Sequence, residues 1–401
     1  MLYSVSVRGG RVRLTAAAAA AAAAVAAVGN VQLARLASPP GIQSYLLILH
    51  SAWTGAEGTG RHLCIASTST GILVFCDVRF SSNLNSIVCG FWFCMSGGTG
   101  FIGSALVHQL RFTKFKPVVI SRKQSFPTTL TWIYASVKVE MTFLKDEIKR
   151  NGLPSDCQGV VNLAGATIGD AKKRWTEKYK QEVYQSRIET TSLLAELLKN
   201  EQKNPKVFIT ASGIGYYPPG TSEIFTENSE VNCWNDYFSK LCQEWEIAGD
   251  LGEKAIHRRV TVRIGLVLGR NGGALRQMYL PFWLGLGGHL ASGEQPLPWI
   301  HIDDLVGIFI HALMNSNVRG ILNAVAPSMI TNAEFTKAFG KALHRPTLFP
   351  VPEFALNFAF GKERAKMLIQ GQKVKPQRTI ESGYKFKYTN IYDAMKQIVE
   401  N

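Results

Sequence analysis

The strongest structural signal in the chain is the glycine-rich run Gly97-Gly98-Thr99-Gly100-Phe101-Ile102-Gly103. An apolar stretch at 87–94 precedes this run and predicts a buried strand, while residues 104–110 follow it and predict a helix. A strand, a glycine-rich turn and a helix in this order favour a site where backbone N–H groups hold a dinucleotide pyrophosphate. The spacing alone is a weak signal, so a glycine turn that binds no ligand is the alternative. The candidate cofactor contacts in this run are Gly97, Gly100, Phe101, Ile102 and Gly103.

Length and composition are those of a globular protein with one large domain or two. The chain has 401 residues, 46% of them hydrophobic, and a mean hydropathy of +0.03. Its net charge is +15 at pH 7, which indicates either an anionic partner or a basic solvated surface. The densest basic patch, at 172–175, is short, and no Lys/Arg run interleaved with aromatic residues occurs, so we expect no nucleic-acid binding.

The cysteines do not form a recognised metal-binding or disulfide pattern. There are 7 of them, an odd number, and no Cys-x-x-Cys pair occurs. This usage indicates a reducing compartment and disfavours a disulfide framework. The positions are Cys64, Cys76, Cys89, Cys94, Cys157, Cys233 and Cys242.

Residues 1–85 differ from the rest of the chain. They contain the alanine run 16–24 and have no acidic residue before Glu57. An arginine-containing, acid-free start is typical of an organelle transit peptide, and a basic region before the apolar stretch 14–28 also resembles a secretory signal. That stretch is short for a membrane span, which needs about 20 apolar residues. We therefore expect mitochondrial targeting, with a cytoplasmic protein as the alternative, or else a low-complexity extension that does not fold.

Beyond residue 86, apolar strand segments alternate with helical segments. This alternation predicts an α/β fold with a doubly wound parallel sheet of the Rossmann type. Glycine and proline become frequent after residue 270, which predicts a dinucleotide-binding domain at 86–270 and a smaller C-terminal subdomain at 271–401 that covers the cofactor site. The expected strands are 117–121, 159–163, 206–210 and 259–265, and the expected helices are 176–199, with Thr176 as its cap, 236–249, 303–314 and 332–343.

Further motifs resemble those of the extended and atypical short-chain dehydrogenase/reductases, in particular their epimerase family branch. The resemblance extends from about residue 95 to the C-terminus. It implies a Rossmann-type fold, an NADP cofactor, and an oxidoreductase or nucleotide-sugar-epimerase-like activity on an unidentified small molecule, and it leaves a homodimer open. Besides the glycine run, its motifs are Ser121-Arg122-Lys123, Asn162-Leu163-Ala164-Gly165, Arg263-Ile264-Gly265-Leu266-Val267-Leu268-Gly269, Pro298-Trp299-Ile300-His301-Ile302-Asp303-Asp304 and Gly371-Gln372-Lys373-Val374-Lys375-Pro376-Gln377-Arg378.

The residues after the second strand favour NADP over NAD. An acidic residue at this position would bind the ribose 2′-hydroxyl of NAD, whereas this chain has Ser121, Arg122 and Lys123. A guanidinium group pairs bidentately with phosphate oxygens, so Arg122 suits the 2′-phosphate of NADP. Ordinary loop cations are the alternative.

The resemblance implies cofactor contacts beyond the glycine run. It implies that Leu163 and Ala164, at the end of a strand, pass close to the adenosine and ribose, and that Val267 lies near the nicotinamide. It also implies contacts from the long helix, at Glu182 and Arg187. From the residues alone, a solvated pair between Glu182 and Arg187 is the preferred alternative.

The catalytic residues depart from the pattern of the family. Short-chain reductases generally use Ser, Tyr and Lys, with the tyrosine as general acid/base and the lysine four residues later. Ser212 and Lys240 match two of these positions, but Asp236 stands four residues before Lys240 and Tyr237 three before. Tyr237 therefore shares a helix face with Lys240 only at a shifted angle. The candidates are Ser212, Tyr237 and Lys240, with Tyr216 and Tyr217 as substitute acids.

The displaced tyrosine keeps two functions open. One is an NADP(H)-dependent oxidoreductase or epimerase. The other is a non-catalytic NADP(H)-binding or redox-sensing protein, in which Tyr237 is a core aromatic residue and Lys240 a surface lysine.

The cluster of His301, Asp303 and Asp304 has metal-ligand chemistry, but a helix start explains it better. We expect Asp303 to cap a helix over 304–314, with the acidic residues complementing the helix dipole, and we expect no metal site. Arg378, in the last motif, is a candidate for the substrate side on its match alone.

Overall fold

The chain forms two compact units, Met1–Cys89 and Gly90–Asn401. The first boundary thus falls a few residues after the expected one at 85, and residue 270 separates no further compact unit. The computed structural model describes residues 5–8, 11–14, 31–35, 45–49, 60–67, 73–80, 91–110, 113, 115–121, 140–143, 152–153, 157–169, 173–201, 206–220, 222–231 and 236–400.

Antiparallel strands make up the described part of the first unit. Their bounds are β1 (Val5–Arg8), β2 (Arg11–Leu14), β3 (Val31–Arg35), β4 (Tyr45–Leu49), β5 (Gly60–Ser67) and β6 (Leu73–Phe80). β1 pairs with β2, and a second sheet has the order β3-β4-β5-β6. These strands differ from the expectation that residues 1–85 lack regular structure, because β6 is rich in residue types that favour strands and pairs with β5 along its whole length. The alanine run 16–24 lies outside the described residues.

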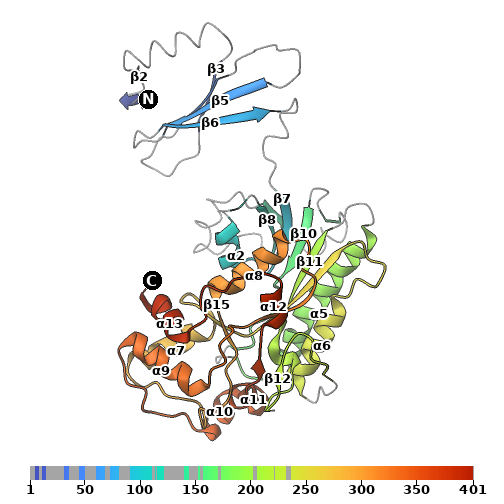
Figure 1. Ribbon diagram of the computed structural model, residues 1–401, viewed down its shortest axis with the longest axis vertical. Helices are drawn as coiled ribbons and strands as arrows, with labels where there is room; N and C mark the ends of the chain where they lie inside the picture. Colours follow the sequence, from blue (N-terminus) through green and yellow to red (C-terminus); the bar gives the residue numbers. More distant parts are fainter. Residues whose placement is uncertain are drawn as a thin grey trace. The chain divides into compact units, whose positions relative to one another are not determined.

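The second unit is built on a 7-stranded parallel sheet (Figure 1). Its strands are β7 (Phe91–Ser96), β8 (Phe115–Ser121), β9 (Glu140–Phe143), β10 (Cys157–Asn162), β11 (Val207–Gly213), β13 (Arg258–Ile264) and β16 (Gly320–Ala324). They lie in the order β16-β13-β11-β10-β7-β8-β9. The winding therefore reverses between β7 and β10, which is the point where sheets of this kind bind ligands at the carboxyl ends of their strands.

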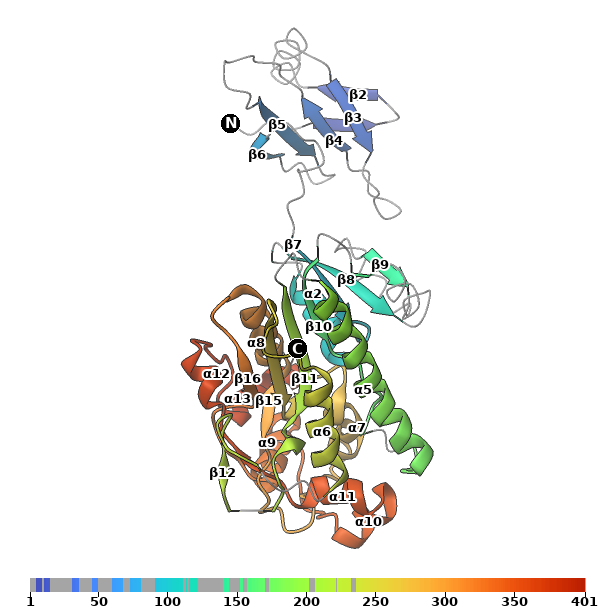
Figure 2. The same ribbon diagram turned by 90° about the vertical axis from the view of Figure 1, so that its right-hand side faces the viewer.

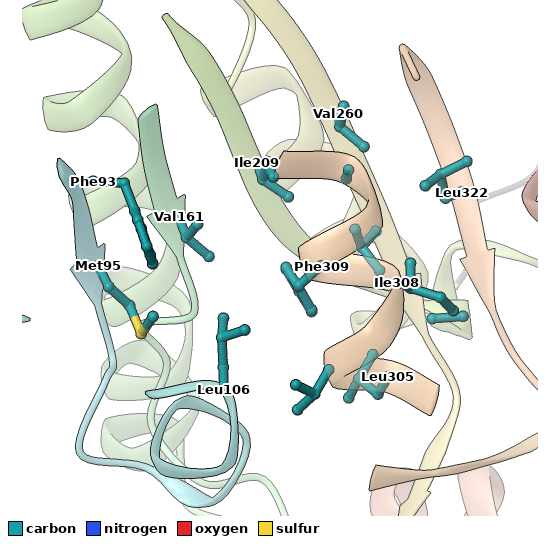
Figure 3. Packing of buried hydrophobic residues seen from close by; sticks show 14 of the residues in the cluster. Phe93, Met95, Leu106, Val161, Ile209, Val260, Leu305, Ile308, Phe309 and Leu322 are labelled. Carbon is teal, nitrogen blue, oxygen red and sulfur yellow. The ribbon is translucent and has the colours of Figure 1, made fainter. Parts of the chain in front are cut away.

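Helices cover both faces of this sheet (Figure 2). Those in the two layers are α2 (Phe101–Leu110), α5 (Glu177–Asn200), α6 (Tyr237–Ala248) and α8 (Ile302–Met314). Because side chains alternate along a strand, Phe93 and Met95 of β7 pack in one cluster with α2 and α8, whereas Cys94 packs in another with α5. Figure 3 shows the first cluster, with Leu106 of α2 and Phe309 of α8 packed against the sheet.

Residues after 270 belong to the same unit as the sheet. β16 pairs with β13, and Leu322 of β16 is buried in the main hydrophobic cluster, so the expected C-terminal subdomain contributes a strand to the nucleotide-binding fold. A second cluster joins Phe282, Phe339 and Met395 from three helices. The remaining elements are a short 3-10 helix (Ile214–Tyr216), β12 (Ile224–Phe225), β14 (Leu266–Leu268), α7 (Gly273–Trp283), β15 (Trp299–His301), α9 (Asn332–Leu343), α10 (Glu353–Phe360), α11 (Lys362–Ile369), β17 (Lys373–Val374), α12 (Gln377–Glu381) and α13 (Ile391–Glu400).

The ends of the long helices follow local capping rules. Thr176 Oγ1 accepts from the N–H of Tyr179, which confirms the predicted cap of α5. Asp236 caps α6 in the same way, by accepting from the N–H groups of Phe238 and Ser239. In the described part of the chain, every helix is too short or too polar to cross a membrane.

Candidate functional site

The glycine run forms a tight turn between β7 and α2. Gly97 has a φ of +74°, a conformation that favours glycine, and a Cβ there would lie 2.5 Å from the carbonyl carbon of Leu163. A Cβ on Gly103 would lie 2.3 Å from the carbonyl oxygen of Gly97. Glycine at 97 therefore lets the turn approach the end of β10, and glycine at 103 lets α2 start directly against the turn.

The N-terminus of α2 offers hydrogen-bond donors to an anion. The N–H groups of Phe101, Ile102 and Gly103 lie in the first turn of the helix and have no intrahelical partner. Gly100 precedes them and is exposed, and a Cβ on it would meet the carbonyl oxygen of Gly97 at 3.3 Å. The backbone here is therefore a cradle that a side chain would fill, and its dipole favours negative charge.

Buried polar side chains join the ends of β7 and β10. Ser96 Oγ donates to Asn162 Oδ1 (2.5 Å), and Asn162 Nδ2 donates to Thr191 Oγ1 on α5 (2.7 Å). The N–H of Ala164 donates to the same Oδ1 (3.1 Å). These bonds fix the two strand ends at the point where the winding of the sheet reverses.

The structure brings predicted cofactor residues from three segments together. Ile102 of α2, Leu163 after β10 and Val267 of β14 are half-buried and pack against the same hydrophobic cluster. A Cβ on Gly272 would lie 2.4 Å from the ring of Phe101, so glycine at 272 leaves room for this ring. The start of α2 is thus held between β10 and the segment that follows β14.

The segment 121–123, which is expected to select NADP, is described only in part. Ser121 is the last residue of β8, and β8 pairs with β7 up to Ser96, so the backbone of Ser121 lies at the same edge of the sheet as the glycine turn. The side chain of Ser121 and the whole of Arg122 and Lys123 lie outside the described residues. A contact between Arg122 and a 2′-phosphate stays a prediction.

Arg187 is buried, unlike the solvated partner of Glu182 that the residues alone favoured. Its Cζ would lie 2.9 Å from a Cβ on Gly165, and its Nη1 donates to the carbonyl oxygen of Val183 (3.0 Å). Among the described residues its Nε has no hydrogen-bond partner, and burial lowers the pKa of the guanidinium. Glu182 is exposed and pairs with Lys173 (3.7 Å). A buried guanidinium beside the end of β10 suits an anionic ligand.

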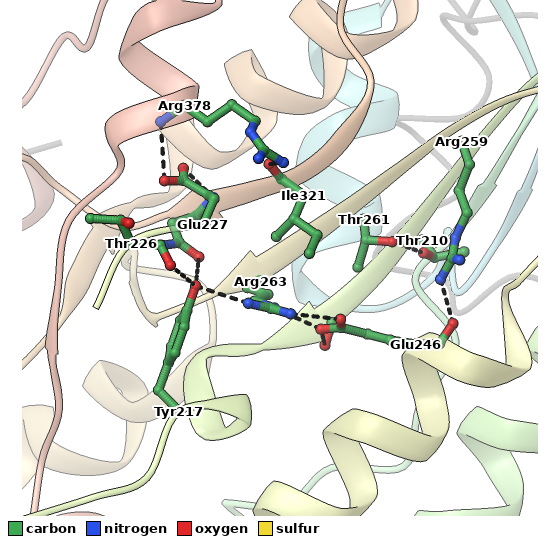
Figure 4. Close-up of polar contacts among 12 residues, drawn as sticks. Thr210, Tyr217, Thr226, Glu227, Glu246, Arg259, Thr261, Arg263, Ile321 and Arg378 are labelled. Atoms are coloured by element: carbon green, nitrogen blue, oxygen red, sulfur yellow. Dashed lines mark hydrogen bonds and ion pairs between the residues drawn. The ribbon is translucent and has the colours of Figure 1, made fainter. Parts of the chain in front are cut away.

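Ser212 is buried at the end of β11 and donates to Glu246. Its Oγ lies 2.7 Å from Glu246 Oε1, and Glu246 accepts from Nε and Nη2 of Arg263, each at 2.8 Å. Figure 4 shows the salt bridge between Glu246 and Arg263. Burial opposes the charge on Arg263, but its bonds to Glu246 prevail and raise the pKa of the guanidinium. The hydroxyl of Ser212 is therefore engaged by protein groups.

Tyr237 and Lys240 are not brought to Ser212. Tyr237 Oη donates to the carbonyl oxygen of Lys180 (2.8 Å), and its ring packs edge-on against Trp175, with 5.4 Å between ring centroids. Burial raises the pKa of Tyr237 to about 12, whereas a general acid/base needs a lowered pKa. Lys240 is exposed on α6, and no hydrogen bond among the described residues joins any two of the three side chains.

The two substitute acids differ in exposure. Tyr217 is fully buried, and its hydroxyl lies 2.9 Å from Arg263 Nη1, from Asn323 Oδ1 and from the carbonyl oxygen of Thr226. Burial raises the pKa of Tyr217. Tyr216 is half-buried, and the guanidinium carbon of Arg263 lies 3.4 Å from its ring centroid. Of the two, Tyr216 is the candidate that a substrate can reach.

The prediction that Asp303 caps α8 is wrong. The helix begins one residue before Asp303, so His301 is the cap, and its Nδ1 accepts from the N–H of Asp303 (3.1 Å). Asp304 is fully buried and accepts from Tyr384 Oη (3.0 Å) and from the N–H of Lys387 (2.7 Å). Within the described ranges, no group of three His, Cys, Asp or Glu side chains is arranged to hold a metal ion.

Arg378 lies at the start of α12, where protein groups surround it (Figure 4). Its N–H donates to Glu227 Oε2 (3.0 Å), and its Nη2 donates to Asn228 Oδ1. Glu227 is buried and also accepts from the N–H of Asn323 on β16 (2.9 Å). This network fixes the last sequence motif against the sheet, and a contact of Arg378 with substrate stays a prediction.

The role of Glu246 could not be predicted from the sequence. It lies six residues after Lys240 on the same helix, and its partner Arg263 is on β13. Only the placement of α6 beside the ends of β11 and β13 reveals the pair. The available signal was Arg263 itself, a charged residue between the apolar residues Val262 and Ile264 of its strand.

Two family patterns match the chain. The NAD dependent epimerase/dehydratase family matches residues 93–324, and a domain of unknown function (DUF1731) matches residues 351–398. The human "Epimerase family protein SDR39U1" is 44% identical over 305 residues, which cover 76% of this chain and 98% of that protein. The Arabidopsis thaliana "Epimerase family protein SDR39U1 homolog, chloroplastic" is 36% identical, over 76% of this chain and 86% of that protein.

Solved structures show the same likeness. The human epimerase family protein SDR39U1 (isoform2), crystallised with NADPH, has a TM-score of 0.71 and 42% identity, over 77% of this chain and 99% of that one. A UDP-glucuronic acid 4-epimerase from Bacillus cereus has a TM-score of 0.60 at 17% identity and shares the fold.

The parallel sheet and the glycine turn at its reversal point define a Rossmann-type protein of the extended short-chain dehydrogenase/reductase class. The chain belongs to the NAD dependent epimerase/dehydratase family. The expected fold class and the family resemblance are both confirmed.

Proposed function

We propose that this protein is an NADP(H)-dependent oxidoreductase or epimerase that acts on a small molecule. The observation that carries the proposal is the cradle between β7 and α2, where glycines at 97 and 103 bring backbone donors to the reversal point of the sheet. The N–H groups of Phe101, Ile102 and Gly103 would hold the pyrophosphate. The bound dinucleotide would supply the hydride chemistry, and the protein would bind and orient it.

The choice of NADP(H) over NAD(H) rests on Ser121, Arg122 and Lys123. A hydroxyl followed by a guanidinium suits a 2′-phosphate and offers no carboxylate for a 2′-hydroxyl. The human relative was crystallised with NADPH, which supports the same choice.

Arg187 adds a buried positive charge to the proposed site. Its side chain is 8% exposed, its Nε has no partner among the described residues, and Gly165 makes room for it after β10. An anionic group of the cofactor would compensate this charge, and the cost of burying the guanidinium would then be offset on binding.

Calorimetric titration of the full chain with NADPH and with NADH tests the proposal. We expect NADPH to bind about tenfold or more tightly than NADH, because one charged hydrogen bond contributes about 1.5 kcal/mol or more. The Arg122→Ala variant should lose this preference and keep its affinity for NADH. If neither nucleotide binds, the proposal is wrong, and equal binding of both removes the role given to Arg122.

A second candidate function is cofactor binding without hydride turnover. The observation that favours it is that Tyr237 donates to a backbone carbonyl and Ser212 to Glu246, so neither hydroxyl is directed to a substrate by Lys240. This function predicts NADPH binding but no NADPH oxidation across a panel of carbonyl compounds and nucleotide sugars. A measured oxidation that is lost in Lys240→Ala and retained in Lys254→Ala, a lysine outside α6, would contradict it.

A mitochondrial location is also proposed, with a cytoplasmic one as the alternative. It rests on the arginine-containing, acid-free start of the sequence, and the name of the plant relative places that protein in another organelle, the chloroplast. Imaging of the full chain with a C-terminal fluorescent tag would test it. A diffuse signal would favour the cytoplasmic alternative.

A further inference from the structure

Side chains hold the loop that follows β10, here called the β10 loop (residues 163–169). This loop has no helix or strand of its own, so its position depends on bonds to its neighbours. From α5, Ser186 Oγ accepts from the N–H of Ala166 (2.9 Å), and Tyr179 Oη donates to the carbonyl oxygen of Thr167. These bonds fix the middle of the loop to α5.

The β10 loop begins on the proposed cofactor side. A Cβ on Gly97 would lie 2.8 Å from the backbone nitrogen of Ala164, so the loop and the glycine turn are in direct contact. One residue later, Gly165 lies against the guanidinium of Arg187. A shift of the loop would therefore displace both the turn and the buried cation.

Arg364 of α11 holds the far end of this loop. The residue is 4% exposed, its Nη1 donates to the carbonyl oxygen of Ile168 (3.3 Å), and its Nη2 donates to that of Lys173 (2.8 Å). Its Nε donates to the carbonyl oxygen of Phe360 (2.9 Å), which fixes the guanidinium to the end of α10 (Glu353–Phe360), the helix before its own. The guanidinium carbon also lies 5.1 Å from the ring centroid of Trp175. One planar group thus links α11 to two points after β10.

Glu363, the neighbour of Arg364, ties α11 to the start of α5. Its Oε2 accepts from Trp175 Nε1 (2.7 Å) and pairs with Lys180 Nζ (2.7 Å). Burial opposes ionisation of this carboxyl group, but the bonds from Lys180 and Trp175 prevail and lower the pKa of Glu363. The ion pair is therefore present at neutral pH.

Both residues lie in the segment 351–398, which matches a domain of unknown function. We propose that Glu363 and Arg364 form a clamp by which this segment holds the β10 loop against bound NADP(H), and that opening of the clamp controls release of the cofactor. The two are positioning residues that do not touch the cofactor. Arg364 acts on the loop directly, and Glu363 acts through the start of α5, the helix from which Tyr179 and Ser186 bond to the loop. This inference rests on the proposed function.

The rate of NADPH release, followed by stopped-flow fluorescence on the full chain, tests the clamp. Arg364→Ala should release NADPH about tenfold faster, because the carbonyl oxygen of Ile168 in the loop and that of Lys173 beyond it lose a charged donor. Arg364→Lys should release it about threefold faster, because a lysine keeps the charge but lacks the fork that reaches both carbonyls. Glu363→Gln, which loses the ion pair with Lys180, should behave like Arg364→Lys. Lys366→Ala, at an exposed position of the same helix, is the matched control and should release NADPH like the wild type.

Two further measurements separate the clamp from general stability. The unfolding midpoint of the cofactor-free protein should fall only slightly in Arg364→Lys, because a lost hydrogen bond to a carbonyl oxygen costs about 1 kcal/mol, and the faster amide exchange in this variant should be confined to residues 164–169. If Arg364→Ala does not fold, Arg364→Lys and Glu363→Gln decide the matter. Wild-type release rates in both of these variants would overturn the clamp alone. A wild-type protein that binds no NADPH would overturn the proposed function, and the clamp with it.

Discussion

The turn after β7 and the polar groups at the ends of β11 and β13 lie at the carboxyl edge of one sheet but are built in opposite ways. The turn consists of backbone, and it leaves the N–H groups at the start of α2 available to a ligand. At the end of β11, Ser212 donates to Glu246, and Glu246 accepts from Arg263 of β13. Protein groups thus fill the second region, whereas glycines keep the first one open. The contrast teaches that cofactor binding and catalytic turnover have separate structural requirements in this fold.

Among the variants that test this contrast, Gly97→Ala should have the largest effect, a loss of NADPH affinity. The new Cβ would lie 2.5 Å from the backbone of Leu163 and would force the turn away from β10, so we expect NADPH affinity to fall about 100-fold. Calorimetry on the folded variant measures the loss, and denaturant unfolding measures the accompanying destabilisation.

Gly152→Ala is the matched control for Gly97→Ala. Gly152 has the same φ of +74°, but nothing lies within 4 Å of a Cβ there. The unfolding free energy of this variant should fall by about 1–2 kcal/mol, because alanine is strained at this φ, and its NADPH affinity should equal that of the wild type. Equal NADPH affinities in the two variants would show that the turn is not the binding site.

Glu246→Ala should destabilise the fold without affecting the cofactor. It leaves the 2% exposed side chain of Arg263 without its carboxylate, which costs about 3–5 kcal/mol when a buried pair is broken. Denaturant unfolding gives the loss in stability, and the NADPH dissociation constant of the folded fraction should stay unchanged. A large loss of NADPH affinity would instead show that both regions contribute to cofactor binding.

Tyr237→Phe should have a smaller effect and lower the free energy of unfolding by about 1 kcal/mol, because it removes one hydrogen bond to the carbonyl oxygen of Lys180. A tyrosine whose pKa is raised from 10 to about 12 contributes stability that is present below pH 10 and is lost as the pH rises towards 12. The difference in stability between the two proteins should therefore narrow above pH 10. Ultraviolet titration should show that Tyr237→Phe removes a tyrosinate that forms near pH 12, and one that forms below pH 10 would contradict this account.

Lys240→Ala should have the smallest effect. The side chain is exposed, so unfolding free energy should change by less than about 0.5 kcal/mol and NADPH affinity should not change. Thermal unfolding and calorimetry check both values. A loss of NADPH-dependent activity in this variant would show that Lys240 has a catalytic role and would contradict the separation of the two regions.

Local sequence signals predicted the elements that local chemistry determines. The cap at Thr176, the sheet with its glycine turn and the helix over 332–343 all follow from short-range patterns. The misplaced cap at Asp303 shows the limit, since a histidine two residues earlier competes for the same helix start.

The rest of the site depends on partners that are distant in sequence. Arg364 reaches Lys173 across 191 residues, and Arg263 meets Glu246 across 17 residues from another element. The burial of Arg187 could not be predicted for the same reason, because the room for its guanidinium comes from Gly165 on a different segment. No spacing within one helix or strand carries this information.

A crystal structure of the full chain grown with NADPH is the most direct measurement of the central claim. The pyrophosphate should lie at the start of α2, with its oxygens within hydrogen-bond distance of the N–H groups of Ile102 and Gly103, and with the Arg187 guanidinium turned to the cofactor. Nucleotide density at any other place, or none at saturating NADPH, would contradict the claim.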